Sequence, residues 1–218
     1  MKTLIIAPHM DDEAISCGGL ILRRGEMGGR VRVLAIHGRN YGFVGTVEQR
    51  RSDEAERDDF FAALGALGIS RNSGHCLMVR EGAPAEAGFY GLLGPIESEL
   101  KSYQPDEVVI PSADDLNQDH RHLNHVAKIA LRPIAIGPVT KVLEFCALDG
   151  RVRAPNHFVT LTRSELDTKL RAINCYRRER RHLPSPRAPE NVEAQARVWG
   201  AACGHIFAEA YVQTLGKE

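Results

Sequence analysis

The sequence reads Leu4-Ile5-Ile6-Ala7-Pro8-His9-Met10-Asp11-Asp12-Glu13, an apolar run that leads directly into an imidazole and three carboxylates. The apolar residues favour a short buried strand, so the polar residues would follow its carboxyl end. A second stretch has the same design, because Val108-Val109-Ile110-Pro111 precedes the acids and histidines of residues 114–122. Two strands of one parallel sheet would bring both polar clusters to the same edge, where open α/β folds bind ligands.

Strand-sized apolar runs alternate with helical patterns along most of the chain. We expect strands at 2–7, 31–37, 75–79, 107–111, 140–147, 157–161 and 206–213, and helices at 12–27, 47–68, 89–103, 119–131, 163–180 and 190–201. Loops are expected at 38–45, 82–88 and 183–189. This alternation predicts an α/β fold with a mostly parallel central sheet. The length of 218 residues suits one domain that spans 1–218.

The composition argues against several classes of partner. Lys plus Arg and Asp plus Glu number 28 each, so no net charge favours nucleic acid or an anionic membrane. No apolar run approaches the roughly 20 residues of a membrane span. The five cysteines are scattered, and we expect them to be reduced thiols. With no signal-peptide pattern at the start, these features predict a cytoplasmic protein that acts on a small molecule.

The two polar clusters together predict a metal site. Adjacent residues point about 100° apart on a helix, so Asp11 and Asp12 would take different tasks. His9 lies three residues before Asp12, and both can converge on one ion if the chain turns tightly between them. His120, near the start of the helix expected at 119–131, would supply a third ligand. Three mixed ligands and a spare Asp11 describe a hydrolytic Zn²⁺ site, and Fe²⁺ or Co²⁺ would suit the same ligands.

A structural interpretation competes with this one. Acidic residues directly after a strand are also favourable at the start of a helix, where they cap its amide groups. Each cluster by itself fits that interpretation. Two clusters that both follow strands and both combine His with Asp favour the metal site.

The motifs resemble those of the LmbE-like, or PIG-L, zinc deacetylases. Residues 8–13 resemble that family's (A/P)-H-x-D-D-E motif, and residues 117–121 resemble its H-P-D-H-R motif. Arg197-Val198-Trp199-Gly200 and Ala208-Glu209-Ala210-Tyr211 are similar to the family's closing pattern. The resemblance implies a Rossmann-like three-layer sandwich and hydrolysis of an N-acyl, usually N-acetyl, amine on a sugar.

The resemblance also implies roles for single residues. His9, Asp12 and His120 would hold zinc, and Asp11 would be the general base. Asn117 replaces the family's first His of the second motif, so we expect its amide to take over the stabilisation of the oxyanion, with His122, His125 or Tyr41 as alternatives. Asp119 would orient a ligand imidazole or cap the helix.

Substrate contacts are expected from the loop after the second strand. Arg39, Asn40 and Tyr41 would hold sugar hydroxyls or a phosphate, although a solvent-exposed loop explains them equally well. Arg51 at the start of the long helix would face the pocket or solvent.

The metal-site residues and the resemblance together predict a zinc-dependent N-deacetylase of an amino sugar or its conjugate, and the resemblance permits self-association into a homo-oligomer. A deformylase or amidase that acts on a non-sugar amine is the alternative enzyme. A non-catalytic α/β binding module is a third hypothesis, although the first strand lacks the glycine pattern of nucleotide-binding loops.

Overall fold

A computed structural model of the chain describes residues 1–38, 53–80, 84–132, 139–146, 148, 154–177 and 181–216. The strands are β1 (Lys2–His9), β2 (Arg30–Gly38), β3 (Gly74–Arg80), β4 (Glu107–Pro111), β5 (Lys141–Phe145), β6 (His157–Leu161) and β7 (Phe207–Gly216). The helices are α1 (Asp12–Glu26), α2 (Asp53–Ala66), the 3-10 turn η2 (Arg71–Ser73), α3 (Pro84–Tyr103), α4 (Gln118–Ala130), α5 (Arg163–Cys175) and α6 (Pro189–Ala202). None of the helices in these ranges is long and apolar enough to cross a membrane.

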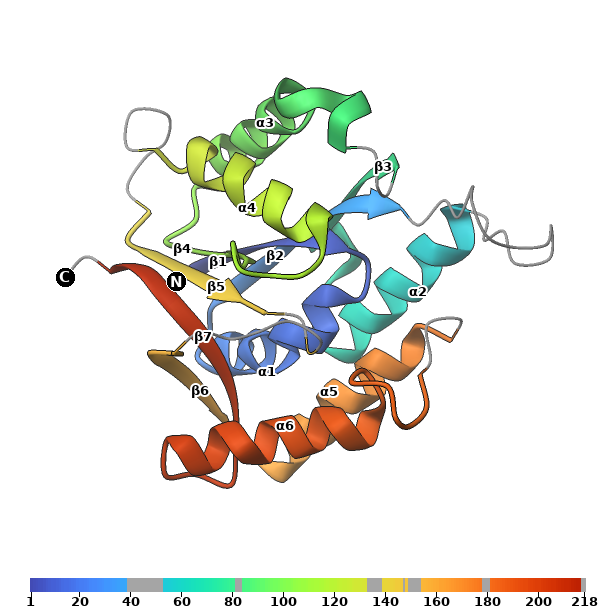
Figure 1. The fold of residues 1–218 in the computed structure, drawn as a ribbon, viewed down its shortest axis with the longest axis vertical. Helices are drawn as coiled ribbons and strands as arrows, with labels where there is room; N and C mark the ends of the chain where they lie inside the picture. The colour runs from blue at the N-terminus through green and yellow to red at the C-terminus, as the bar shows by residue number, and fades with distance from the viewer. Residues whose placement is uncertain are drawn as a thin grey trace.

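The strands form one sheet of seven in the order β3-β2-β1-β4-β5-β7-β6 (Figure 1). The first five strands are parallel, and β7 runs antiparallel to both β5 and β6. The predicted α/β class with a mostly parallel sheet is therefore confirmed.

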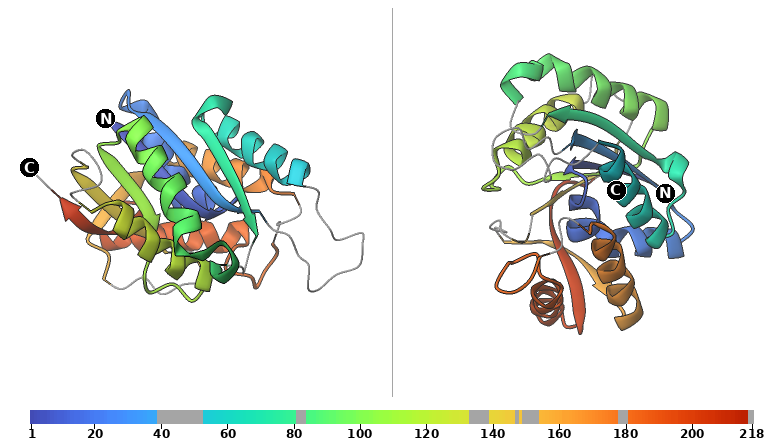
Figure 2. Two further views of the ribbon diagram at one scale, coloured as in Figure 1. Left: turned by 90° about the horizontal axis from the view of Figure 1, so that it is seen from above. Right: turned by 90° about the vertical axis from the view of Figure 1, so that its right-hand side faces the viewer.

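Helices cover both faces of the sheet and create three layers (Figure 2). Successive strand residues point to opposite faces, so Ile5 and Ala7 join one core while Leu4 and Ile6 join the other. The first core includes apolar residues of α1, α2 and α5, and the second includes those of α3 and α4. Both faces of β1 are thus buried, which explains why its sequence is continuously apolar rather than alternating.

The chain order places a switch point between β1 and β4. From β1 the chain proceeds to β2 and β3 on one side, and it then returns to place β4 and β5 on the other. The connections after β1 and β4 therefore diverge to opposite sides at the carboxyl edge. Such a switch point leaves a crevice at the strand ends, which is where doubly wound sheets bind ligands.

Helix α1 packs closely against the two antiparallel strands. A Cβ atom added to Gly19 would lie 2.5 Å from Leu161 Cδ2 on β6, so the glycine permits this approach. The amide of Gly19 donates to Glu209 Oε1 on β7 at 2.7 Å. This contact fixes the position of α1, whose first residue is Asp12.

Some predicted boundaries were wrong. The segment 82–88 was expected to be a loop, but α3 already begins at Pro84, since proline at a first helical position has the required φ and needs no amide partner. The helix expected over 163–180 ends at Cys175, and residues 178–180 of that range lie outside the described residues. Gly38, the first residue of the predicted loop at 38–45, is instead the last residue of β2. The rest of that loop and the start of the helix predicted at 47 fall on residues 39–52, outside the described residues.

Candidate metal centre

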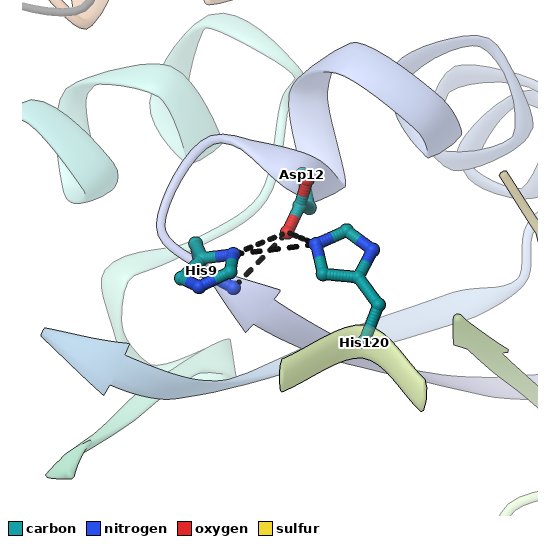
Figure 3. A group of neighbouring side chains, drawn as sticks. All are labelled: His9, Asp12 and His120. Atoms are coloured by element: carbon teal, nitrogen blue, oxygen red, sulfur yellow. Dashed lines mark hydrogen bonds and ion pairs between the residues drawn. The ribbon is translucent and has the colours of Figure 1, made fainter. Parts of the chain in front are cut away.

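Three side chains from the two predicted clusters meet at the switch point. His9 is the last residue of β1, Asp12 is the first of α1, and His120 lies in the first turn of α4. Asp12 Oδ2 lies 3.2 Å from His9 Nδ1 and 3.1 Å from His120 Nε2. The three side chains point toward one another, and their ligand atoms all lie within 4.8 Å (Figure 3). A single ion of ordinary size could contact all three.

A carboxylate binds the far side of each imidazole. Asp119 Oδ2 lies 3.3 Å from Nε2 of His9, and Asp115 Oδ2 lies 2.9 Å from Nδ1 of His120. Carboxylates in this position fix the ring orientation of metal-binding histidines and increase their basicity. The structure thus brings Asp119 to His9, as one of its two predicted roles requires. Asp115 belongs to the second polar cluster, and its contact with His120 was not predicted.

The carboxylates control the charge of the two imidazoles. Burial by itself would lower the pKa of His9, but hydrogen bonds to Asp119 and Asp12 outweigh it and raise the pKa to about 9. Burial acts in the same direction on His120, and Asp12 and Asp115 raise its pKa to about 10. Burial would raise the pKa of Asp12, whereas the two imidazoles hold it well below its usual value. The site therefore favours positive charge at its centre.

These residues fit a divalent cation. His9, Asp12 and His120 are all at most 1 % exposed, so an ion held there would be shielded from bulk water. Asp12 Oδ1 is buried and has no hydrogen-bond partner among the described residues, which leaves a lone pair available for an ion. Imidazole and carboxylate ligands suit zinc, and they also suit Fe²⁺ or Co²⁺.

Asp11 adopts a backbone conformation that separates its side chain from that of Asp12. It has φ of 156° and ψ of −25°, a region that residues with a Cβ rarely adopt. Its carbonyl accepts the amides of Ala14 and Ile15, but its carboxylate does not cap α1. Instead Asp11 Oδ2 lies 3.3 Å from Nη1 of Arg187. The structural interpretation of Asp11 as a side-chain cap is therefore wrong.

A buried pair, Glu13 and Tyr176, supports the backbone conformation of Asp11. Glu13 Oε2 accepts the Asp11 amide at 3.1 Å, and its Oε1 accepts a hydrogen bond from the hydroxyl of Tyr176. Glu13 and Tyr176 are 0 % and 2 % exposed. Tyr176 immediately follows α5, so this contact ties the end of that helix to the turn that carries Asp11.

Asn117 serves as the N-cap of α4. The side-chain Oδ1 of Asn117 accepts a hydrogen bond from the backbone N–H of Asp119 at 2.8 Å. The backbone N–H of Asn117 donates to Asp115 Oδ1 at 2.9 Å. The side-chain NH₂ remains its only group able to donate to a substrate. Among the other predicted contributors, His125 is exposed on α4. The predicted substrate residues Arg39, Asn40, Tyr41 and Arg51 lie outside the described residues.

Two contributors could not be found by reading motifs. Arg187 lies in the predicted loop at 183–189, and Tyr176 belongs to none of the motifs. Each reaches the site only through tertiary contacts, since the sequence separation is 176 for Arg187 and Asp11 and 163 for Tyr176 and Glu13. The sequence offers no local spacing that connects these pairs.

The fold and the site define the class of this protein: it is an α/β protein with a buried His/Asp/His group that could hold a metal ion at a sheet switch point, and a further carboxylate beside it. The chain belongs to the PIG-L family, described as GlcNAc-PI de-N-acetylase, and residues 4–131 match that family. No curated protein sequence matches the chain significantly.

Solved structures share the fold over nearly the whole chain. N,N'-diacetylchitobiose deacetylase from Pyrococcus horikoshii is 21% identical with a TM-score of 0.79, over 99% of this chain and 84% of that one. The 4-carboxy-2-hydroxymuconate hydratase GalB from Pseudomonas putida is 20% identical with a TM-score of 0.79, over 100% and 98%. The teicoplanin deacetylase Orf2, solved in a zinc-inhibited form, is 16% identical with a TM-score of 0.72, over 98% and 97%.

Proposed function

We propose that the protein is a metal-dependent N-deacetylase that removes an acetyl group from an amino sugar or an amino-sugar conjugate. One observation carries this proposal. A buried His9, Asp12 and His120 group stands beside a second carboxylate, that of Asp11, which points to a different partner. Membership of the PIG-L family supports the reaction, and the deacetylases among the structural neighbours support the substrate class.

His9 Nδ1, His120 Nε2 and an oxygen of Asp12 would hold the ion, which we propose to be zinc. When bound, such an ion lowers the pKa of water and polarises the amide carbonyl. Asp115 and Asp119 keep the imidazoles oriented toward it. Three protein ligands are typical of catalytic rather than structural zinc, in which a further position takes water or substrate.

Asp11 would move the protons of the reaction. In this proposal its carboxylate takes a proton from the attacking water and later gives it to the nitrogen that leaves, which free carboxylates near a reacting centre commonly do. Arg187 holds Oδ2 at 3.3 Å and so orients the carboxylate. The NH₂ group of Asn117 would donate to the oxyanion, and Arg39, Asn40, Tyr41 and Arg51 remain the proposed substrate contacts.

The decisive experiment combines metal depletion with a panel of substrates. After its metal is removed with a chelator, the protein should release no acetate from N-acetylhexosamines and their conjugates. Addition of stoichiometric zinc, Fe²⁺ or Co²⁺ should restore acetate release. Activity that survives complete metal loss would rule out this mechanism. Activity only on formylated or other non-sugar amides would support the alternative deformylase or amidase.

The likeness to GalB calls for one further assay. That neighbour is a hydratase with the same fold, so the fold alone does not choose between hydrolysis and hydration. Water addition to an unsaturated carboxylic acid can be followed by loss of ultraviolet absorbance. A protein that hydrates such an acid and releases no acetate from the panel would be a hydratase.

A further inference from the structure

A cavity lies between α1, α5, α6 and β7. Figure 1 shows these helices on the face of the sheet opposite α3 and α4. Its volume is about 120 Å³. One ordered water needs only roughly 10–15 Å³ of such space, so the cavity can hold a small organic molecule. Nothing in the proposed reaction uses it.

One end of the cavity is formed by a buried ammonium group. Lys169 is 4 % exposed, and its Nζ lies 2.5 Å from Oε1 of Glu209. Glu209 also accepts the amides of Gly19 and Leu20 and the hydroxyl of Tyr211, at 2.7, 2.8 and 2.7 Å. Four donors thus occupy this carboxylate, and it has little capacity to bind a cationic ligand.

Lys169, in contrast, has donors to spare. An ammonium group carries three N–H bonds, and within the described ranges Glu209 is the single acceptor within hydrogen-bond distance of Nζ. A buried donor without an acceptor is costly, so the cavity favours a molecule that brings an oxygen acceptor to this end. Gln195, also part of the lining, can donate its side-chain amide as well.

Apolar side chains form part of the remaining lining. Ile15, Leu148, Val192 and Trp199 contribute to the lining. Ordered water needs two or more polar partners, so water satisfies the Lys169 end but not these walls. A ligand with an anionic oxygen at one end and a short hydrocarbon at the other satisfies both.

We propose that this cavity is a second binding site, which takes a small carboxylic acid with a short apolar tail. Its carboxylate accepts from Lys169 and Gln195, and its tail lies against Trp199 and Val192. Ser16, another lining residue, lies one helical turn after Asp12 on α1. The proposed deacetylation releases an acid of this class. Only this connection between the cavity and the reaction rests on the proposed function.

The chain contains a built-in reporter for the test, because Trp199 is its only tryptophan. Butyrate and butyramide, which share a tail, are titrated separately while tryptophan fluorescence is recorded. We expect a saturable change with butyrate and binding of butyramide weaker by about tenfold or more, since charged hydrogen bonds are the stronger ones. Equal affinities would overturn the proposed recognition by Lys169.

Variants locate the bound acid. Ala196 lines the cavity and is 4 % exposed, so Ala196→Leu should fill the space and abolish the signal. Ala201→Leu makes the same change at an exposed position of α6 and should bind butyrate normally. Lys169→Met should weaken butyrate binding by about tenfold or more. An unchanged affinity in Ala196→Leu would overturn the proposal even if Lys169→Met fails to fold.

The metal centre is the competing place for an acid. His120→Ala and chelated wild-type protein should both retain the fluorescence response to butyrate. Loss of the response in both would assign the acid to the metal centre and overturn the cavity site. A protein without deacetylase activity that still binds butyrate would refute the proposed function while it upholds this site.

Discussion

Nδ1 of His9 lies 3.3 Å from Nε2 of His120, although 111 residues separate the two in the sequence. Two ring nitrogens at this distance both face Oδ2 of Asp12. The structure thus directs three ligand atoms toward one small volume, and a cation there interacts with all of them. Protons and a metal ion therefore compete for these three ligand atoms.

The competition makes metal binding dependent on pH. With pKa values raised to about 9 and about 10, His9 and His120 hold protons at neutral pH when no metal is present. Metal uptake should therefore release about two protons per ion, and affinity should increase with pH until both values are passed. Calorimetry in buffers of different ionisation enthalpy measures this release. Uptake with no proton release would contradict the raised pKa values.

The same shifts fix the sign of a stability effect in the metal-free protein. A raised pKa stabilises the fold only while the imidazole keeps its proton. This contribution is complete below the usual value of 6.5 and is lost as the pH rises through 9 to 10.

The two neighbouring aspartates should fail in different ways. Asp11→Asn should keep a full complement of metal and lower kcat by roughly two to four orders of magnitude, the usual effect of removing a general base. Asp12→Asn should lose metal affinity, because it removes a charged ligand. Elemental analysis beside steady-state kinetics separates the two results. Metal loss in Asp11→Asn would show that this carboxylate is a ligand instead.

Asp115 and Asp114 form a matched pair for testing the support of the imidazoles. Asp115→Asn should weaken metal binding by about 10–100-fold, because it removes the carboxylate that orients His120. Asp114 is exposed on the same loop, and Asp114→Asn should change metal affinity little. Competition with a chromogenic chelator measures both affinities. Equal effects in the two variants would argue for general damage to the loop.

Tyr176→Phe tests whether Glu13 positions Asp11. Without the hydroxyl, Glu13 loses a buried partner and holds the Asp11 amide less firmly, so kcat should fall by about tenfold while KM and metal content are retained. Tyr103→Phe is the control, because its hydroxyl donates to the Arg30 carbonyl at the other end of the sheet. That variant should lose a hydrogen bond and keep its kcat. Equal losses of kcat would make Tyr176 merely structural.

The pair of Arg24 and Glu107 should determine stability at low pH. Burial would raise the pKa of Glu107, but two hydrogen bonds from Arg24, both 2.8 Å long, lower it below the usual 4.5. Its contribution is therefore present above pH 4.5 and is lost as the pH falls through the lowered value. Glu107→Gln should cost about 3 kcal/mol at neutral pH, since it leaves Arg24 buried without its charged partner.

Urea unfolding at neutral pH and in acid checks this expectation. The difference in unfolding free energy between Glu107→Gln and wild type should shrink in acid, because Glu107 then becomes protonated in both the folded and the unfolded protein. Glu193→Gln changes an acid in an ion pair with the exposed Arg163, and it should leave the unfolding free energy nearly unchanged. A gap that grows as the pH falls would contradict the lowered pKa.

The sequence by itself determined the local parts of this protein. Continuous apolar runs at residues 2–7 and 107–111 predict strands buried on both faces, and His9, Asp12 and His120 follow them at positions that chain connectivity places at one edge. Such features are readable because side-chain type and short-range spacing set them. Pro84 shows the limit, because its helix start competes with a loop pattern that is equally reasonable.

Only the tertiary structure decided which distant groups complete the site. Arg187 and Tyr176 reach Asp11 and Glu13 from the last third of the chain. The cavity at Lys169 likewise exists only where four elements pack together. These relationships depend on contacts between residues far apart in sequence, and no local pattern encodes the packing that brings them together.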